Sequence, residues 1–284
     1  MKVTFWGTRG SLAAPSAETV RYGGNTSCVA VEGSAGTVLI LDAGTGIRNL
    51  GQSLPVDLKR VDILLTHLHM DHIQGLPFFA PLRRKGVEVH IWGPASTTLS
   101  LNARLQKYLS PPLFPVSVRD LSENLHFHEL PEELPTHFIE VGEFAISAQL
   151  IIHPNPTIGY RIQCAEAALT YMPDHEPALG DQTFPLEKEW TSGYALAEGC
   201  DLLIHDAQFS DEEYQKRIGF GHSSIRQAFQ FAQLTDVKQF APFHYDPTHT
   251  DDELDRLFAQ ATAELHPTYT VTPSREGLTV EVVC

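Results

Sequence analysis

Residues 66–72, THLHMDH, constrain this chain more than any other segment of the sequence. They follow the apolar run DILL, which is typical of a buried strand, so the polar groups lie where a strand leaves a sheet. His67 and His69 are two residues apart and project to the same side of an extended backbone. Asp71 and His72 begin the next turn and can face a second position. Imidazole and carboxylate are ligands of zinc, manganese and iron, so we predict two neighbouring metal ions here.

The bulk composition indicates an ordinary globular protein. The chain has 284 residues, of which 42% are hydrophobic and 19% are charged, and we predict a single domain over residues 1–284. The sequence contains no apolar run of about 18 residues, so we expect no membrane association, and its first residues do not resemble a signal peptide. Four scattered cysteines without a CxxC pair favour a reduced, cytoplasmic setting.

The charge balance argues against a long polyanionic partner. Lysine and arginine number 20 and the acids number 35, which gives a formal net charge of −15. Affinity for nucleic acid depends on basic residues that neutralise phosphates. A chain this acidic is therefore a poor candidate for gripping a long nucleic acid.

The order of strand-like and helix-like segments predicts two sheets with helices outside them. Strand-like runs cluster in the first part of the chain, and later runs alternate with helix-like segments. The expected helices span residues 74–85, 95–109, 211–217, 223–234 and 251–264.

With these segments in view, THLHMDH resembles the signature of the metallo-β-lactamase-fold hydrolases. LDAGTG, IIHPNPTIGYRI, LTYMPDHEP and APFHYDP are similar to further motifs of that family, in the same order along nearly the whole chain. The resemblance implies an α/β fold, a four-layer αββα sandwich, in which Asp42 supports the metal loop. It also implies two divalent transition-metal ions, zinc first and manganese or iron as alternatives. The implied ligands are His67, His69 and His153 at one ion, Asp71, His72 and His244 at the other, and Asp174 between them.

Other segments narrow the resemblance to the branch of ribonuclease Z and related small phosphodiesterases. These are FWGTRGS, GGNTSC, GYRI, LIHDA and GHSSIRQA. In this branch the histidine of the GHS segment is a catalytic acid, which implies that role for His222. A carboxylate after the histidine of an HEA-like segment orients it, which implies Asp206, although ribonuclease Z has a glutamate there. Asp71 also belongs to the implied catalytic set. The sequence leaves open the role of His175 and of residues 175–190, an irregular stretch that could form a flap.

The remaining histidines carry less information. His126 and His128 are two residues apart, but no carboxylate joins them at ligand spacing, so we predict no metal role for them. His205 lies within an apolar strand-like run and is expected to be a hydrogen-bonded core residue.

Three classes of function are compatible with this pattern. The first is hydrolysis of a small phosphodiester, such as a cyclic nucleotide, by a hydroxide held between two metals. The second is a ribonuclease Z-like endonuclease that processes tRNA 3′ ends, and a lactonase or thioesterase of the same fold is a further alternative. The third is a non-catalytic binding scaffold. His153 and Asp174 are only 21 residues apart, which leaves no room for the basic arm of ribonuclease Z. We therefore expect a small phosphodiester substrate, no long nucleic acid and, as in relatives of this branch, a homodimer.

Overall fold

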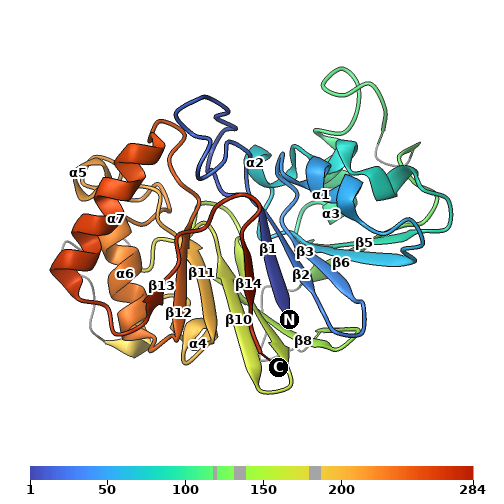
Figure 1. The fold of residues 1–284 in the computed structure, drawn as a ribbon. Helices are drawn as coiled ribbons and strands as arrows, with labels where there is room; N and C mark the ends of the chain where they lie inside the picture. Colours follow the sequence, from blue (N-terminus) through green and yellow to red (C-terminus); the bar gives the residue numbers. More distant parts are fainter. Residues whose placement is uncertain (118–119, 131–138, 179–186, 284) are drawn as a thin grey trace.

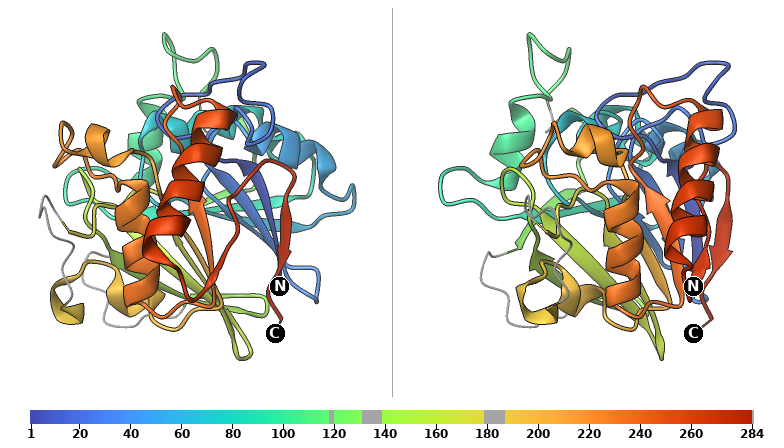
Figure 2. Two further views of the ribbon diagram at one scale, coloured as in Figure 1. Left: turned by 60° about the vertical axis from the view of Figure 1, so that its left-hand side comes forward. Right: turned by 90° about the vertical axis from the view of Figure 1, so that its left-hand side faces the viewer.

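Two β-sheets lie face to face, with helices on both outer sides (Figure 1). This computed structural model describes residues 1–117, 120–130, 139–178 and 187–283. Figure 2 shows the same layers from two further directions, with the C-terminal helices gathered on one side of the sheets. The predicted four-layer αββα sandwich is confirmed.

The first sheet combines antiparallel pairing at one end with parallel pairing at the other. Neighbouring strands from β14 to β3 pair antiparallel, and those from β3 to β6 pair parallel. Across the sheet the order is β14 (Thr279–Glu281), β1 (Lys2–Gly7), β2 (Cys28–Glu32), β3 (Val38–Leu41), β4 (Arg60–Leu64), β5 (Glu88–Pro94) and β6 (Leu125–Leu130).

The second sheet has the same mixed character. Strands β7 to β10 pair antiparallel, and strands β10 to β13 pair parallel. The order is β13 (Thr270–Val271), β12 (Gln239–Phe243), β11 (Leu202–Asp206), β10 (Ala167–Met172), β9 (Ile158–Cys164), β8 (Phe144–Leu150) and β7 (Ile139–Val141).

Seven α-helices and several 3₁₀ turns cover the outer faces of the sheets in the described ranges. The first sheet carries α1 (Ile47–Ser53), α2 (Met70–Ile73) and α3 (Leu101–Gln106), and the second carries α4 (Tyr194–Ala197), α5 (Asp211–Tyr214), α6 (Ile225–Leu234) and α7 (Asp251–Leu265). Among these residues no helix is both long and apolar enough to cross a bilayer.

Helix boundaries depart from the expected ranges where prolines and caps intervene. The expected helix 74–85 is two short 3₁₀ turns, Leu76–Phe78 and Ala80–Arg83, because Pro77 and Pro81 remove helical hydrogen bonds. The expected helix 95–109 begins only at Leu101, after the N-cap of Ser100. The helix expected at 211–217 ends at Tyr214, and those expected at 223–234 and 251–264 are α6 and α7 with ends shifted by at most two residues.

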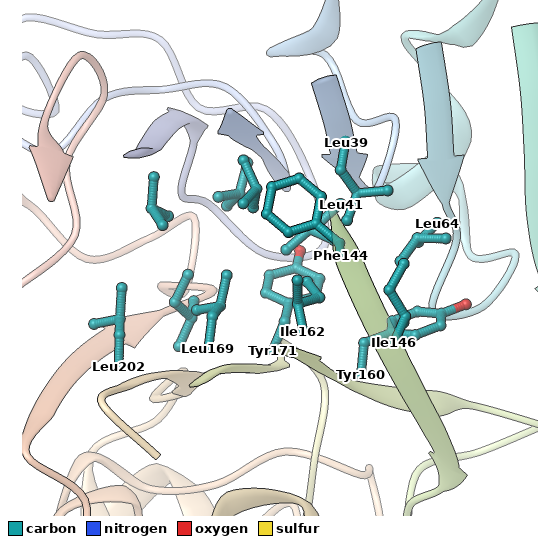
Figure 3. Close-up of a cluster of buried hydrophobic side chains, with 14 of the residues drawn as sticks. Leu39, Leu41, Leu64, Phe144, Ile146, Tyr160, Ile162, Leu169, Tyr171 and Leu202 are labelled. Atoms are coloured by element: carbon teal, nitrogen blue, oxygen red, sulfur yellow. The ribbon is translucent and has the colours of Figure 1, made fainter. Parts of the chain in front are cut away.

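The central core lies between the two sheets (Figure 3). It joins leucines of β3 and β4 to aromatic and aliphatic side chains of β8 to β11, and two further apolar clusters seal each sheet against its helices. Tyr160 and Tyr171 cross this core and donate their hydroxyl hydrogens to Leu65 O at 2.7 Å and Asp42 Oδ2 at 2.9 Å. These two bonds fix the sheets to each other at the edge where β3, β4 and β10 end.

Candidate metal centre

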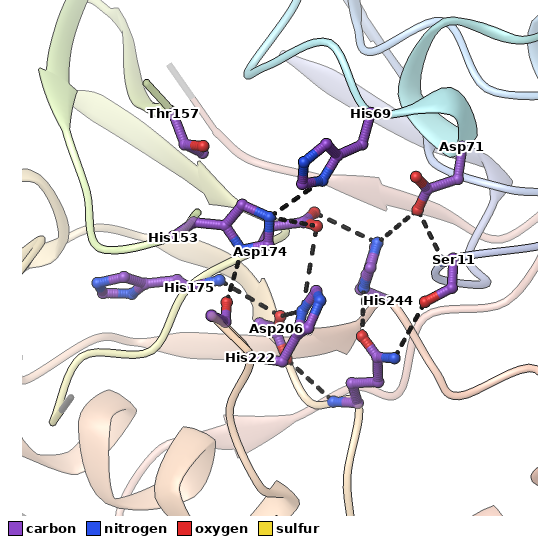
Figure 4. A network of polar contacts seen from close by, with 12 residues as sticks. Ser11, His69, Asp71, His153, Thr157, Asp174, His175, Asp206, His222 and His244 are labelled. Carbon is purple, nitrogen blue, oxygen red and sulfur yellow. Dashed lines mark hydrogen bonds and ion pairs between the residues drawn. The ribbon is translucent and has the colours of Figure 1, made fainter. Parts of the chain in front are cut away.

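The seven predicted ligands converge where parallel strands of both sheets end. Figure 4 shows five of them, His69, Asp71, His153, Asp174 and His244. The carboxyl ends of parallel strands lie at the same sheet edge, so the loops that follow β4, β10 and β12 meet there. Within each group, one ligand atom per residue lies within 4.8 Å of the others. The first group is His67, His69, His153 and Asp174, and the second is Asp71, His72, Asp174 and His244.

Asp42, at the end of β3, holds the histidine-rich segment in place. Its buried carboxylate accepts hydrogen bonds from Thr66 N at 2.8 Å, from the Thr66 hydroxyl and from Tyr171. It also accepts from Nδ1 of His72 at 2.8 Å. The Asp42 backbone is left-handed, with a φ of 60°, which turns the carboxylate toward this segment. The geometry agrees with the supporting role that the sequence implies for Asp42.

Asp174 lies between the two groups and is almost completely buried. Its Oδ2 is 3.7 Å from Nε2 of both His67 and His153. Its Oδ1 is 3.0 Å from Nε2 of His72 and 3.2 Å from Nε2 of His244. One carboxylate therefore faces both groups, one oxygen to each.

Hydrogen bonds on the far side of the second-group rings leave lone pairs facing inward. Nδ1 of His72 donates to Asp42, and Nδ1 of His244 donates to Gln208 Oε1 at 3.1 Å. A neutral imidazole has one N–H, so Nε2 of each ring carries a lone pair. These two nitrogens are only 3.2 Å apart and also face the carboxylate of Asp174. Lone pairs so close together repel one another unless a proton or a metal cation lies between them.

The first group shows the same orientation. Nδ1 of His153 donates to Gly221 O at 2.8 Å, and Nδ1 of His67 donates to the Thr66 hydroxyl at 3.1 Å. Nε2 of His67 and Oδ1 of Asp174 are buried without a hydrogen-bond partner. Buried polar groups normally have partners, so these atoms fit metal ligation. The residues present therefore fit the two metal ions that the fold implies.

The local electrostatics favour the metal-binding forms of His67, His153 and Asp174, whereas His72 competes for a proton. Burial lowers the pKa of His67 well below its usual value and that of His153 to about 4, which keeps both rings neutral. Burial alone would raise the pKa of Asp174, but His244 and His72 hold it well below the usual range. Burial also opposes the charged form of His72, yet Asp174, Asp71 and Asp42 raise its pKa well above the usual value. A bound cation would take the place of that proton.

His222 and Asp206 lie beside the second group as a hydrogen-bonded pair. Nδ1 of His222 donates to Asp206 Oδ2 at 2.7 Å, and the His222 ring stacks on His244 with centroids 5.1 Å apart. The other carboxylate oxygen accepts from the main-chain N–H groups of Gln208 and Ser223. The shorter aspartate thus reaches the histidine. Burial opposes the charged form of His222, but Asp206 raises its pKa above the usual value.

The GHS loop requires its glycine and is tied to the segment that carries Asp174. Gly221 has a φ of 87°, and a Cβ there would meet Pro154 Cδ at 2.2 Å and His153 Nδ1 at 2.4 Å. Glu176, two residues after Asp174 and fully buried, accepts hydrogen bonds from Gly219 N, Gly221 N and the Tyr214 hydroxyl. Nothing in the sequence pattern marked Glu176, because a single glutamate in an irregular stretch carries no periodic signal.

The other histidines that the structure describes lie outside both groups. His175, whose role was open, points away from them (Figure 4), and its Nδ1 contacts His205 Nε2 at 2.9 Å. His205 packs on Phe231 in the core, as expected. His126 and His128 stack with His90 on the first sheet. Of the stretch 175–190, residues 179–186 lie outside the described part of the chain, and so does the flap interpretation there.

Ribonucleases Z are similar in sequence to this chain along most of its length. Ribonuclease Z of Staphylococcus carnosus is 24% identical over 308 residues, covering 92% of this chain and 93% of the relative. Ribonuclease Z of Exiguobacterium sibiricum is 29% identical over 266 residues, covering 82% of this chain and 87% of the relative.

Solved structures show the same fold. The metallo-β-lactamase fold protein YhfI from Bacillus subtilis has a TM-score of 0.70 at 20% identity, with 98% of each chain covered. Human tRNase Z, short form, has a TM-score of 0.66 at 21% identity, with all of each chain covered. A diphosphatase from the PhnP family also shares this fold, with a TM-score of 0.65 at 19% identity over 100% of this chain and 98% of that chain. Yeast PDE1 shares it with a TM-score of 0.59 at 16% identity over 100% of this chain and 99% of that chain.

The family model described as "Beta-lactamase superfamily domain" matches residues 37–245, the part of the chain that carries all seven candidate ligands. The resemblance to metallo-β-lactamase-fold hydrolases of the ribonuclease Z-like branch is thereby confirmed, and this chain belongs to the β-lactamase superfamily.

Proposed function

We propose that this protein is a metal-dependent hydrolase of small phosphodiesters. The observation that carries the proposal is the Asp174 carboxylate, which presents one oxygen to each of two groups of histidine and aspartate ligands. Adjacent sites of this kind suit in-line displacement at phosphorus. The cytoplasmic setting and the homodimer stay predictions from the sequence.

The two groups would each hold one divalent ion, and zinc suits ligand sets rich in imidazole. When bound, such ions neutralise charge on phosphoryl oxygens and lower the pKa of a water ligand. Asp42, Gln208 and the carbonyl of Gly221 hold three of the ligand rings from behind, so that their Nε2 atoms point at the site before substrate arrives. Such preorganisation avoids rearrangement during the reaction.

His222 is placed to act as the general acid. Asp206 accepts the Nδ1 hydrogen, which leaves Nε2 as the nitrogen that can give a proton to the departing oxygen. As the bond from phosphorus to that oxygen breaks, the proton on Nε2 moves to it, and Asp206 stabilises the charged ring beforehand. General acid catalysis of this kind typically contributes about 10²–10⁴-fold.

The short link between His153 and Asp174 supports a compact substrate. After His153 the chain enters β9 at Ile158, turns at residues 165–166 and returns along β10 to Met172. All of these residues are described, and none of them forms an arm. The alignment with the S. carnosus ribonuclease Z spans 308 positions against 284 residues here, so segments of that relative have no counterpart in this chain.

A tRNA 3′-processing endonuclease is the second candidate, favoured by the ribonuclease Z relatives along most of the chain. A hydrolysis panel with zinc and with manganese separates the two. It contains nucleoside cyclic monophosphates, linear dinucleotides, bis(p-nitrophenyl) phosphate, lactones, thioesters and a tRNA precursor.

We expect a compact diester to be cleaved far faster than the tRNA precursor. We also expect a rate that depends weakly on salt, because few phosphates are engaged. Site-specific cleavage of the precursor that falls steeply with salt would instead establish the endonuclease. Turnover of lactones or thioesters alone would reject both.

A further inference from the structure

We propose that Gln208 is a positioning residue that fixes the tautomer of His244 and joins it to Asp71. The inference rests on the proposed function for its catalytic consequence, but its first readout is metal affinity. Gln208 is buried just after β11, and sequence reasoning missed it, although it follows Asp206 by only two residues.

Four residues form a closed cycle of contacts along one edge of the second group (Figure 4). Oε1 of Gln208 lies 3.1 Å from Nδ1 of His244, and Nε2 of Gln208 donates to the Ser11 hydroxyl at 3.2 Å. The main-chain N–H of Ser11 donates to Asp71 Oδ2 at 2.7 Å. The same Oδ2 lies 3.1 Å from Nε2 of His244, which closes the cycle.

The orientation of the Gln208 amide decides which nitrogen of His244 is free. With Oε1 toward the ring, Nδ1 carries the hydrogen and Nε2 offers a lone pair to a metal. With the amide reversed, its NH₂ would face Nδ1, and the hydrogen would move to Nε2, where it would block ligation. The Ser11 hydroxyl, as an acceptor for the amide NH₂, stabilises the productive orientation.

The imidazole of His244 cannot turn to another hydrogen-bond partner. His244 has a left-handed backbone with a φ of 62°, and Gly10 packs so closely that a Cβ there would lie 2.3 Å from Nδ1. Since His244 is fully buried, water cannot readily replace the amide oxygen. The tautomer of His244 therefore depends on one side chain from the loop that follows β11.

Gln208 contacts Asp206 through its backbone alone. Its main-chain N–H donates to Asp206 Oδ1 at 3.0 Å, a bond that any side chain at position 208 can keep. Changes to the Gln208 side chain should therefore affect the His244 site while leaving the His222–Asp206 pair intact. This separation distinguishes a ligand-positioning role from an effect on the acid.

The test compares three variants of the full chain, each titrated with Zn²⁺ and Co²⁺ against a competing chelator. Gln208→Met keeps the length of the side chain but removes the amide, Gln208→Glu keeps an acceptor oxygen, and Gln230→Met makes the same change on α6. Residue 230 lies beside Leu265 and Tyr269, outside both ligand groups. Circular dichroism checks that each variant is folded.

We expect Gln208→Met to lower the affinity of the protein for one of the two ions by about 10–100-fold. This is the usual effect of losing a hydrogen-bond partner behind a metal ligand. Gln208→Glu should keep or raise the affinity for that ion, and Gln230→Met should have the metal affinities of the wild type. In ¹⁵N spectra of the zinc-loaded protein, the Nδ1–H signal of His244 should persist in the glutamate variant and change in the methionine variant. The ratio of kcat between diesters with poor and good leaving groups should stay constant in all three.

Wild-type affinity for both ions in Gln208→Met would overturn the proposal. An equal loss in Gln208→Glu would do the same, because it would show that packing rather than the acceptor matters. The metal titration gives its answer even if no phosphodiester is hydrolysed, so failure of the proposed function remains distinguishable from failure of this inference.

Discussion

Replacing Asp206 by asparagine tests whether His222 acts as an acid that the carboxylate stabilises. Oδ1 of Asp206 accepts two main-chain N–H groups at 3.0 and 3.1 Å, and Oδ2 accepts from His222 at 2.7 Å and, more weakly, from the main-chain N–H of His175 at 3.3 Å. An asparagine has a single oxygen, and the two main-chain donors hold it. Its NH₂ then faces Nδ1 of His222, so the ring must become neutral with its hydrogen on Nε2.

The magnitude follows from the bond that is lost. A hydrogen bond to a charged group contributes about 1.5–3 kcal/mol, and about 1.4 kcal/mol is a factor of ten in rate. We therefore expect kcat to fall by roughly 10- to 100-fold on a diester with a poor leaving group. His222→Ala removes the acid altogether and should cost about 10²–10⁴-fold. The double variant should be no slower than His222→Ala, because both changes remove the same contribution.

The assay compares a nucleoside cyclic monophosphate with bis(p-nitrophenyl) phosphate, whose leaving group departs without a proton. Metal content is measured on the same samples. Both single variants should keep their ions and lose little activity on the p-nitrophenyl ester. An equal loss on the two substrates, with metal content unchanged, would refute the acid role and indicate substrate binding or structure.

Further predictions concern the metals, the GHS loop and the buried tyrosine. Purified protein should carry close to two transition-metal ions per chain, and Asp174→Ala should lose at least one of them with nearly all activity; full metal content with retained activity would remove the bridging role. Chelation should lower the melting temperature and zinc should restore it, because an ion that binds only the folded chain stabilises it; an unchanged melting temperature would count against the fit. Gly221→Ala should lower the free energy of unfolding, measured by chemical denaturation, much more than Gly36→Ala does. Both glycines have a φ of 87°, but of the two only Gly221 has atoms within 4 Å of the new Cβ, and equal losses of stability would contradict this reasoning. Tyr171→Phe should lower the free energy of unfolding by about 1.5–3 kcal/mol, since the buried Asp42 carboxylate loses a donor, and a loss below about 0.5 kcal/mol would show that another group replaces it.

Sequence reasoning found the candidate ligands that the structure brings together because their chemistry is local. His67 to His72 lie in one short segment after an apolar strand, and motif order supplied His153, Asp174 and His244. Parallel strands then bring these distant loops to one edge. The two-sheet architecture followed in the same way from the alternation of strand-like and helix-like runs.

The contacts that orient the ligands could not be read from the sequence. Gln208 and Glu176 act through hydrogen bonds to residues 36 and 43–45 positions away, and such distances are set by strand register and loop conformation. The error at residues 74–85 had a visible cause, since Pro77 and Pro81 each interrupt a helix. The cap at Ser100 was also readable, because serine is a favoured N-cap residue and its side chain accepts from Ala103 N.

Glu176 has a consequence for how substitutions elsewhere would be tolerated. Through its bonds to Gly219 and Gly221, the loop that carries His222 is attached to the backbone two residues beyond Asp174. The spacing between His222, the proposed acid, and Asp174 therefore depends on hydrogen bonds between these two loops as well as on the packing of the outer helices. We therefore expect substitutions in the outer helices to change the separation of His222 and Asp174 less than the loss of the Glu176 carboxylate would.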